Sequence, residues 1–361
     1  MYYKYDRATP PHAPQDVMMK RILFLLKRRE DYNAITHNHI GLSTGLYNSA
    51  KFVDNMLNRT IGFTSSLQVC TDANCIDREV TTHKPDIVIL EALWVTPQKL
   101  AELTRLHPTV KWIVRLHSEL PFMANEGIAM DWIGDYSNLS RVYIAANAPR
   151  MLREMEIYTN SIVLYLPNYY NPNMTPTTGR KIELLKTKDR LDIACFGAVR
   201  PLKNHLTQAI AAIEFAESIH RTVNFHINAG RVEMQGGPVL NNLKGLFQQI
   251  YDHGHKLVNH AWRPRDGFLE LCGEMDICLQ SSFSETFNIV GADVISQGVP
   301  LVGSDEIPWQ VVGLADPTNS ENICEHLDFA YRYPQFNVKV NQIGLKMYTN
   351  KTRKIWVKYF K

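Results

Sequence analysis

Short apolar runs alternate with longer amphipathic stretches over the first half of the chain. The runs are ILFLL (22–26), LQVC (67–70), DIVIL (86–90), KWIVRL (111–116), RVYIAA (141–146) and SIVLYL (161–166). Runs of this length without polar alternation are typical of parallel strands buried on both faces, with helices in the stretches between them. The pattern therefore predicts a doubly wound parallel sheet.

The alternation stops at PNYYNP (167–172), a segment rich in residues that break regular structure, and then resumes. The later runs are LDIACFGAV (191–199), VNFHINAG (223–230), KLVNHAW (256–262), DICLQSS (276–282) and PLVGS (300–304). We therefore predict two α/β domains, residues 1–168 and 169–340. Residues 341–361 are basic, and we expect them to form a helix that returns to the first domain. The alternative is that this basic tail contacts a membrane surface or nucleic acid.

Composition narrows the class of protein without naming a partner. The 361 residues are 45% hydrophobic, enough for two domains with their own cores, and the net charge of +3 is too small to indicate a dedicated nucleic-acid-binding domain. The sequence has neither a long apolar run nor a signal-peptide pattern, so we expect a cytoplasmic protein without a transmembrane segment. The six cysteines lack zinc-ribbon spacing and predict reduced thiols, mostly in the core.

In open parallel sheets, ligands bind beyond the carboxyl ends of the strands. The segment GAVRPLKN (197–204) follows one predicted strand and places Gly197, Arg200 and Lys203 before a helix that is expected to begin near Leu206. Cations and backbone N–H groups at a helix entry suit phosphate oxygens. The alternative is a loop whose two charges are simply solvated.

The segment from Met275 to Trp309 is the most informative part of the sequence. Glu285 follows a predicted strand, and Asp293 lies eight positions later in a predicted helix. Glu285 suits the hydroxyls of a sugar and Asp293 suits a ribose, while helix capping would explain the first carboxylate without requiring the second. The predicted helix start offers three amides to a phosphate, those of Thr286, Phe287 and Asn288.

The first domain offers candidates in the same position. His117 follows the run KWIVRL, where a histidine at a strand end suits contact with a ligand, although a lone histidine is more often structural. Glu119 is expected either to orient an acceptor or to cap the next helix. Gly41 and Gly45 open a predicted helix after the first strand. Arg28 directly follows that strand and, with the basic C-terminal residues, is expected to line a groove for phosphates.

The stretch SETFNIVGADVISQGVPLVGSDEIPW (284–309) resembles the donor-binding signature of GT-B glycosyltransferases of the family-four type. In that signature two glutamates separated by seven residues precede a Gly-Pro run, whereas here the second acid is Asp293, one methylene shorter. GAVRPLKN resembles the family's phosphate segment, with Arg200 two residues beyond the family's arginine position. The resemblance spans most of residues 20–332 and implies two facing Rossmann-like domains.

The resemblance implies retaining transfer of a sugar from a nucleotide diphosphate sugar to a hydroxyl acceptor. Lys203 matches the diphosphate-binding lysine, Glu285 the carboxylate at the transferred sugar, and His117 the histidine that faces this sugar. Gly41 and Gly45 resemble the glycine loop at the diphosphate. Because the sequence has no Asp-x-Asp motif, we expect cations and helix N-termini to meet the diphosphate charge, with no cofactor or metal required.

The sequence leaves the donor base and the acceptor open. We expect the segments 228–236 and 258–265 to surround the base of a UDP, GDP or ADP sugar, and residues 27–40 and 119–138 to border the acceptor. The acceptor is a lipid-linked, polysaccharide or small-molecule hydroxyl, or a hydroxymethylated pyrimidine in DNA that the enzyme flips out. The alternatives are a nucleotide-sugar 2-epimerase of the same fold and an inactive protein that binds sugar nucleotides or nucleic acid.

Overall fold

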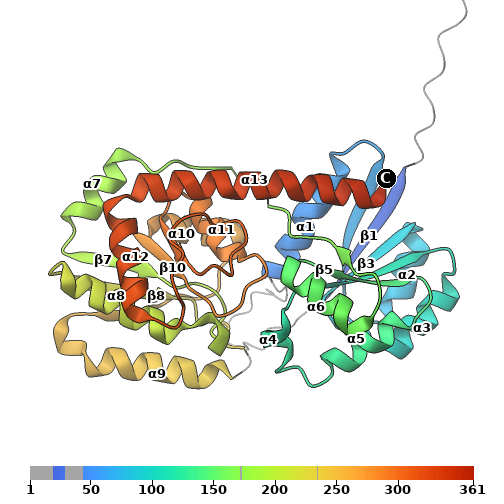
Figure 1. Ribbon diagram of the computed structural model, residues 1–361, viewed down its shortest axis with the longest axis horizontal. Helices are drawn as coiled ribbons and strands as arrows, with labels where there is room; N and C mark the ends of the chain where they lie inside the picture. The colour runs from blue at the N-terminus through green and yellow to red at the C-terminus, as the bar shows by residue number, and fades with distance from the viewer. Residues whose placement is uncertain (1–18, 29–43, 171–172, 234) are drawn as a thin grey trace, which may run out of the picture.

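The structure, a computed structural model, describes residues 19–28, 44–170, 173–233 and 235–361. These residues form two α/β domains that lie side by side, each built on one parallel sheet (Figure 1). Each apolar run predicted from the sequence overlaps one strand, so the predicted doubly wound architecture is confirmed.

The first sheet has six parallel strands in the order β2-β1-β3-β4-β5-β6. The strands are β1 (Lys20–Lys27), β2 (Phe63–Cys70), β3 (Ile87–Glu91), β4 (Lys111–Leu116), β5 (Val142–Ala146) and β6 (Leu164–Tyr165). The helices are α1 (Thr44–Asn58), α2 (Cys75–His83), α3 (Pro97–Leu106), α4 (Leu120–Met123), α5 (Ala129–Ser137) and α6 (Pro149–Thr159). Adjacent strand residues enter different apolar clusters, Leu23 one and Phe24 the other, which explains why the strands are apolar throughout.

The second sheet has five parallel strands in the order β11-β10-β7-β8-β9. The strands are β7 (Arg190–Ala194), β8 (Thr222–Ile227), β9 (Lys256–Asn259), β10 (Ile277–Gln280) and β11 (Leu301–Gly303). The helices are α7 (Gly179–Thr187), η1 (Pro201–Lys203), α8 (His205–Ser218), α9 (Gly236–Gln249), η2 (Tyr251–His253), α10 (Arg265–Glu274), α11 (Ile289–Ser296) and α12 (Ser320–Arg332). Both faces of this sheet are again covered by apolar clusters.

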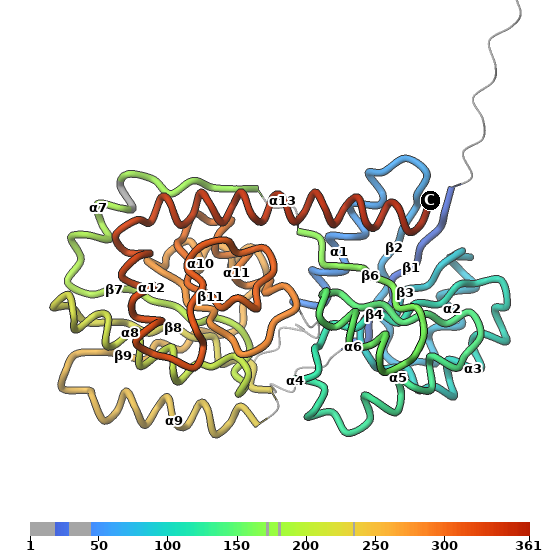
Figure 2. Tube along the Cα trace, in the orientation of Figure 1, coloured from blue at the N-terminus to red at the C-terminus, as the bar shows by residue number. Residues whose placement is uncertain are grey.

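The last helix, α13 (Pro334–Phe360), runs along both domains and ends beside the first (Figures 1 and 2). Leu345 packs in the second domain's core, whereas Trp356 and Phe360 pack in the first domain's core. The indole Nε1 of Trp356 donates to the carbonyl of Pro167 at 2.8 Å. The predicted return to the first domain is therefore confirmed, and the helix begins at Pro334 rather than after residue 340.

Two further expectations concern the cysteines and a membrane span. All six cysteines are free thiols, and Cys70, Cys195, Cys272 and Cys278 are buried. Among the helices in the described ranges, none combines the length and the apolar character that a bilayer span requires.

Candidate active site between the two domains

Residues that follow strands of the first sheet contact residues that follow β10 of the second. The Asn147 amide donates to the Thr286 hydroxyl at 3.1 Å, and this hydroxyl donates to the His117 carbonyl at 3.3 Å. All three residues lie just beyond the carboxyl ends of parallel strands, where open sheets bind ligands. The two binding edges therefore face each other.

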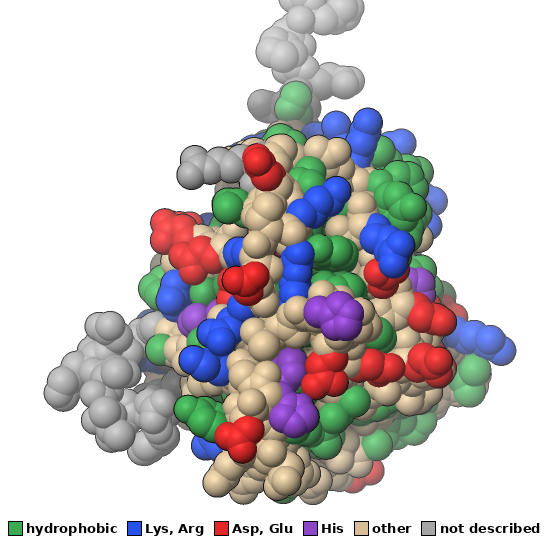
Figure 3. Space-filling model, turned by 90° about the vertical axis from the view of Figure 1, so that its left-hand side faces the viewer, with side chains coloured by type: hydrophobic (Ala, Val, Ile, Leu, Met, Phe, Trp, Pro, Cys, Tyr) green, Lys and Arg blue, Asp and Glu red, His purple; other side chains and the backbone are tan. Residues whose placement is uncertain are grey.

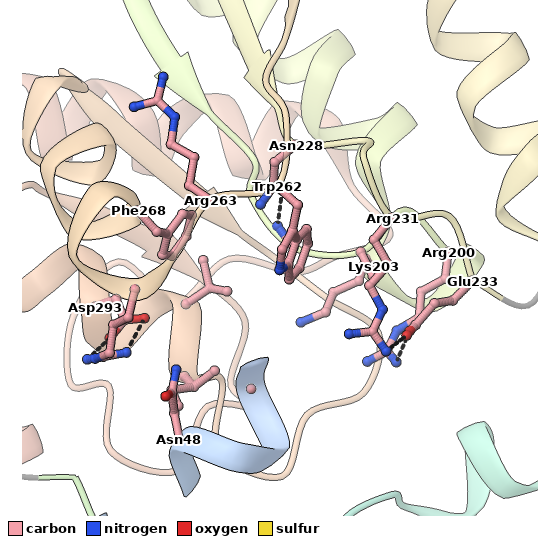
Figure 4. A pocket seen from close by; sticks show the side chains of 16 residues that line it. Asn48, Arg200, Lys203, Asn228, Arg231, Glu233, Trp262, Arg263, Phe268 and Asp293 are labelled. Atoms are coloured by element: carbon pink, nitrogen blue, oxygen red, sulfur yellow. Dashed lines mark hydrogen bonds and ion pairs between the residues drawn. The ribbon is translucent and has the colours of Figure 1, made fainter. Parts of the chain in front are cut away.

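A cavity of about 180 Å³ lies between these edges and is lined by both domains. Gly45 and Asn48 of α1 contribute the first domain's side, and an ideal Cβ on Gly45 would lie 3.7 Å from Ile289 of α11. Figure 4 shows Asp293 and Asn48 on one side of the cavity, Trp262 at its centre and a cluster of charged side chains on the other. Its lining includes Gly197, Arg200, Lys203, Trp262, Arg265 and Asp293.

Lys203 and Glu285 form an ion pair at the wall of this cavity. Asn288 holds the same carboxylate oxygen with a hydrogen bond of 3.2 Å, and its amide also donates to Gln280 at 3.0 Å. The side chains of Lys203 and Glu285 are 11% and 8% exposed. An ammonium group has three N–H donors, so the bond to Glu285 leaves donors for a ligand. Figure 4 shows the Lys203 side chain extending into the cavity.

Arg200 reaches across the cleft toward the first domain. Its guanidinium lies 4.7 Å above the ring of Phe122 in α4, and its Nη1 lies 3.5 Å from the carboxylate of Glu233. Arg231 pairs with the same carboxylate. Arg231 and Glu233 line both this cavity and a second one, so the two cavities adjoin through this cluster.

Asp293 lies at the cavity in the second turn of α11 and is 3% exposed. One carboxylate oxygen accepts hydrogen bonds from the Tyr170 hydroxyl at 2.5 Å and from Arg265 at 2.6 Å, and the other accepts from Arg265 at 3.1 Å. Burial raises the pKa of Asp293, although the charge of Arg265 opposes this shift. Asp293 was predicted to contact a ribose, yet both its carboxylate oxygens already accept hydrogen bonds from other residues of the protein.

Helix α11 begins at Ile289, three residues later than the predicted start at Thr286. Asn288, in the left-handed region at φ 58°, caps the helix, and its side chain accepts an amide hydrogen bond at 2.7 Å. The Thr286 hydroxyl contacts the first domain, and the Phe287 side chain is buried in the core. Ile289 and Val290 line the cavity, so the first amides of α11 lie at its wall.

His117 lines the second cavity, which has a volume of about 150 Å³. Its Nε2 contacts Glu91, and its Nδ1 lies 3.4 Å from the amide nitrogen of Asn147. Because this amide donates, the proton of the neutral ring is on Nε2 and points to Glu91. Burial lowers the pKa of His117, and the charge of Glu91 opposes that shift. The ring is therefore a neutral, oriented imidazole.

Arg115 and Glu91 form a buried pair beneath His117, and both side chains are 0% exposed. Burial opposes ionisation of Glu91, but the charge of Arg115 and the hydrogen bonds from Arg115 and His117 lower its pKa. The Arg115 Nε donates to the Leu166 carbonyl at 2.8 Å, and its Nη2 donates to Asn168 at 2.5 Å. The pair thus ties the sheet to the interdomain connection.

Comparison with protein-family models finds no match, and comparison with curated proteins finds none either. Solved structures do match. HepE from Anabaena, in complex with UDP and glucose, superposes with a TM-score of 0.63 at 14% identity over 93% of this chain and 97% of that one. Sucrose-phosphate synthase from Thermosynechococcus elongatus gives 0.62 at 12% identity over 91% and 94%. The UDP-forming α,α-trehalose-phosphate synthase from Burkholderia vietnamiensis gives 0.64 at 10% identity over 95% and 96%.

The chain has a GT-B fold. Identities of this size establish the fold alone, and the roles of individual residues still rest on the geometry of the GT-B cleft. That cleft brings together Lys203, Glu285, Asp293 and Arg200 from the second domain with Gly45 and His117 from the first.

Three residues that the sequence predicted to belong to the site do not lie in this group. Glu119 is buried, pairs with Arg150 and accepts a hydrogen bond from Ser284 at 3.3 Å, so its carboxylate joins the two domains of the GT-B fold. It makes no side-chain capping bond to α4. Arg28 is exposed at the end of β1, and Gly41 lies outside the described residues.

The prediction of one groove formed by Arg28 and the basic C-terminal residues is wrong. The amide of Lys20, at the start of β1, donates to Gly62, so the loop that contains Thr60 lies beside the start of this strand. Thr60 and Lys354 border the same groove. Arg28 follows the other end of β1, where strands of a GT-B domain face the cleft. The sheet therefore separates the two sets of cations.

Three residues of the site, Arg265, Glu91 and Arg115, were not predicted from the sequence. Arg265 falls within the segment 258–265, which was expected to surround the base, but nothing in the sequence pairs it with Asp293. Arg115 lies inside the predicted run KWIVRL, and Glu91 directly follows the run DIVIL. The signal that could have identified Arg115 was a charged residue inside a run predicted to be buried on both faces.

Within the described residues, one group of three side chains has the spacing of metal ligands: Glu217, His253 and His255. It lies near the amino ends of β8 and β9, at the edge of the sheet opposite the cleft. His255 Nδ1 accepts the amide of Val223 at 3.1 Å, so its Nε2 carries the proton and donates to Glu217. That tautomer does not suit a metal ligand. Figure 3 shows this side of the molecule, with histidines exposed among charges of both signs.

Proposed function

We propose that the chain is a glycosyltransferase that moves a sugar from a nucleotide diphosphate sugar to a hydroxyl acceptor. The observation that carries the proposal is the Lys203–Glu285 pair at the wall of an interdomain cavity, next to the first amides of α11. A cation and helix amides together suit a diphosphate, and a carboxylate suits sugar hydroxyls. The structural neighbour HepE is a complex with UDP and glucose, which supports a sugar nucleotide as the donor.

In this proposal the diphosphate lies between Lys203 and the amides of Ile289 and Val290. Gly197, on the loop before Lys203, has a φ of +119°, which an L side chain rarely adopts. An added Cβ would lie 3.8 Å from the Lys203 Cε, inside the region assigned to the phosphates. Glycine here lets the backbone approach the diphosphate closely.

The remaining parts of the donor follow from this placement. We assign the base to the region of Trp262 and the ribose to the region of Asp293, because both residues line the cavity. The sugar then extends past Glu285 toward His117, which lines the adjoining cavity. The second cavity is the proposed position of the acceptor hydroxyl.

The proposed reaction retains anomeric configuration. The bond between the sugar C1 and the diphosphate oxygen breaks, a bond from C1 to the acceptor oxygen forms on the same face, and the acceptor proton passes to the leaving diphosphate. Lys203, the α11 amides and Arg200 stabilise the charge that develops on the diphosphate. In this proposal the negative charge on the diphosphate is balanced by the protein's own cations and amides.

The test begins with a screen of UDP, GDP and ADP sugars for thermal stabilisation and slow hydrolysis. With the best donor, we expect Lys203→Ala to reduce turnover on the order of 10²-fold or more, because one electrostatic group at the transition state is lost. Lys244→Ala, on the exposed side of α9, is the control and should leave turnover unchanged. Unchanged turnover in Lys203→Ala, with a verified donor, would refute the proposal.

Product analysis separates this reaction from its alternatives. Mass spectrometry of candidate acceptors, including hydroxymethylated DNA, should identify a glycosylated product. An isomerised sugar without any transfer product would instead indicate a 2-epimerase. Stable binding of a sugar nucleotide without any cleavage would indicate an inactive binding protein.

A further inference from the structure

Helix α13 and the residue after it carry positive charge without any negative charge. From Pro334 to Lys361 the sequence has no Asp or Glu. Its basic residues are Lys339, Lys346, Lys351, Arg353, Lys354, Lys358 and Lys361, all exposed. Within the described part of the chain, none of them forms an ion pair with a carboxylate. By contrast, the face in Figure 3 mixes both signs.

The outward ridge of α13 also contains large apolar side chains. Phe336, Ile343 and Met347 are 53%, 50% and 67% exposed. Their spacing of seven and four residues places them on one side of a helix, and the same line continues to Lys354 and Lys358. The ridge is therefore apolar in its first half and cationic in its second.

The cationic half borders an open groove of about 770 Å³. Its lining includes Thr60, Arg353, Lys354, Lys358 and Lys361, and every charged residue among its lining residues is cationic. A surface of this kind attracts an anionic partner. Because the groove lies at the start of β1, away from the cleft, the charge there is separate from the proposed diphosphate site.

We propose that the outward ridge of α13 docks the protein on a membrane surface that contains anionic lipids. The helix has 27 residues and lies along one side of both domains (Figure 1), so it offers an almost straight contact line. At 1.5 Å per residue this line is about 40 Å long. Phe336, Ile343 and Met347 enter the boundary between headgroups and acyl chains, and the lysines contact lipid phosphates.

The apolar residues favour a membrane over nucleic acid. Both partners account for the cations, but a phosphate backbone offers nothing to three half-exposed apolar side chains on a convex ridge. An interfacial helix requires this combination of apolar and basic side chains. The inference does not depend on the proposed sugar transfer, since its test requires no donor.

The experiment measures co-sedimentation of the full chain with vesicles of phosphatidylcholine alone or mixed with phosphatidylglycerol. We expect binding to the mixed vesicles only, weakened by salt. The triple variant Lys351→Glu, Lys354→Glu, Lys358→Glu should partition onto the mixed vesicles on the order of 10²-fold less. The reason is that each lysine near an anionic surface raises the partition coefficient about fivefold. The control makes the same charge change on exposed lysines of the second domain: Lys186→Glu, Lys244→Glu, Lys256→Glu.

A second pair of variants tests the apolar contribution. Ile343→Gln with Met347→Gln should lower partitioning into mixed vesicles about threefold to tenfold, because at least half of the surface of each residue is still available to bury. The matched control is Ile157→Gln with Ile162→Gln, two residues that are 72% and 82% exposed on the first domain. Circular dichroism checks that the folds are unchanged.

Three results would overturn the proposal. The first is equal binding to both kinds of vesicle, and the second is an equal loss in the control variants. The third is a triple variant that loses binding to duplex DNA while vesicle binding is unchanged, which would make the ridge a nucleic-acid surface.

Discussion

Each half of the cleft contains a buried cation–carboxylate pair, and the two pairs differ in their surroundings. Arg115 and Glu91 are completely enclosed in the first domain, with both side chains 0% exposed. Lys203 and Glu285 are 11% and 8% exposed at the wall of the cavity. The first pair is built into the protein, whereas the second is accessible to a ligand.

Hydrogen bonding explains why similar pairs have different uses. The guanidinium of Arg115 has a rigid fork of donors, and these donors bond Glu91, the Leu166 carbonyl and Asn168. The contacts described for the Lys203 ammonium include one carboxylate, that of Glu285. Loss of the first cation should therefore reduce stability, and loss of the second should reduce activity.

The largest expected effect comes from Arg115→Met, which leaves the Glu91 carboxylate buried without its partner. The free energy of unfolding should fall by about 3–5 kcal/mol, as in other broken buried pairs. Urea unfolding monitored by fluorescence measures this change. Adding Glu91→Gln should recover part of the loss, because no buried charge is then left uncompensated. A fall of less than about 1 kcal/mol would contradict this expectation, because it would mean that the pair stabilises the protein no more than an exposed salt bridge does.

The fold could be predicted from the sequence because apolar runs report burial directly. Every predicted run overlaps a strand, and the break at 167–172 falls between the last strand of one sheet and the first of the other. The sequence also indicated Lys203, Glu285 and His117 as site candidates, because each follows a predicted strand. A residue that follows a parallel strand must lie at the sheet's binding edge.

Contacts between distant segments could not be predicted in this way. Arg265 and Tyr170 approach Asp293 from other parts of the chain. The start of α11 depends on the left-handed conformation of Asn288, which the motif does not specify. Arg28 and the C-terminal cations are separated by the length of the eight-residue strand β1, about 25 Å.

A smaller effect should appear as a pH dependence of the unfolding free energy, caused by a histidine near the Lys203–Glu285 pair. His205 begins α8 just after Lys203 and is 0% exposed, and both its ring nitrogens lack a described partner. Burial, with the charges of Lys203 and Arg200, lowers the pKa of His205 from 6.5 to about 3. The unfolded chain therefore takes up this proton at a higher pH than the folded chain. Its contribution to stability is complete above about pH 6.5 and is lost as the pH falls toward about 3.

The measurement compares urea unfolding of the wild-type chain and His205→Leu. Between about pH 7 and pH 5 the wild type should lose about 2 kcal/mol more of its unfolding free energy than the variant. Leucine is chosen because it fills much of the same volume without a titrating group. An equal loss in both proteins would mean that His205 is accessible to protons in the folded state.

The smallest expected effect concerns Asp293, which combines features of both pairs. It lines the cavity like Lys203, yet Arg265 and Tyr170 already engage its oxygens as the protein engages Glu91. Asp293→Asn keeps the shape and removes the charge. If the carboxylate also holds the ribose, the donor KM should rise about tenfold with kcat nearly unchanged, because such a contact is equal in the ground and transition states.

Initial rates at varied donor concentration distinguish a ribose contact from a structural one. Asp266→Asn, exposed in the first turn of α10, is the matched control and should change neither constant. A fall in kcat at constant KM would mean that Asp293 acts by positioning Arg265, whose guanidinium lies 4.9 Å from the ring of Phe52 in the first domain. Asp293 would then resemble Glu91 in fixing the position of an arginine, and the donor's ribose would have to find its partner elsewhere in the cavity.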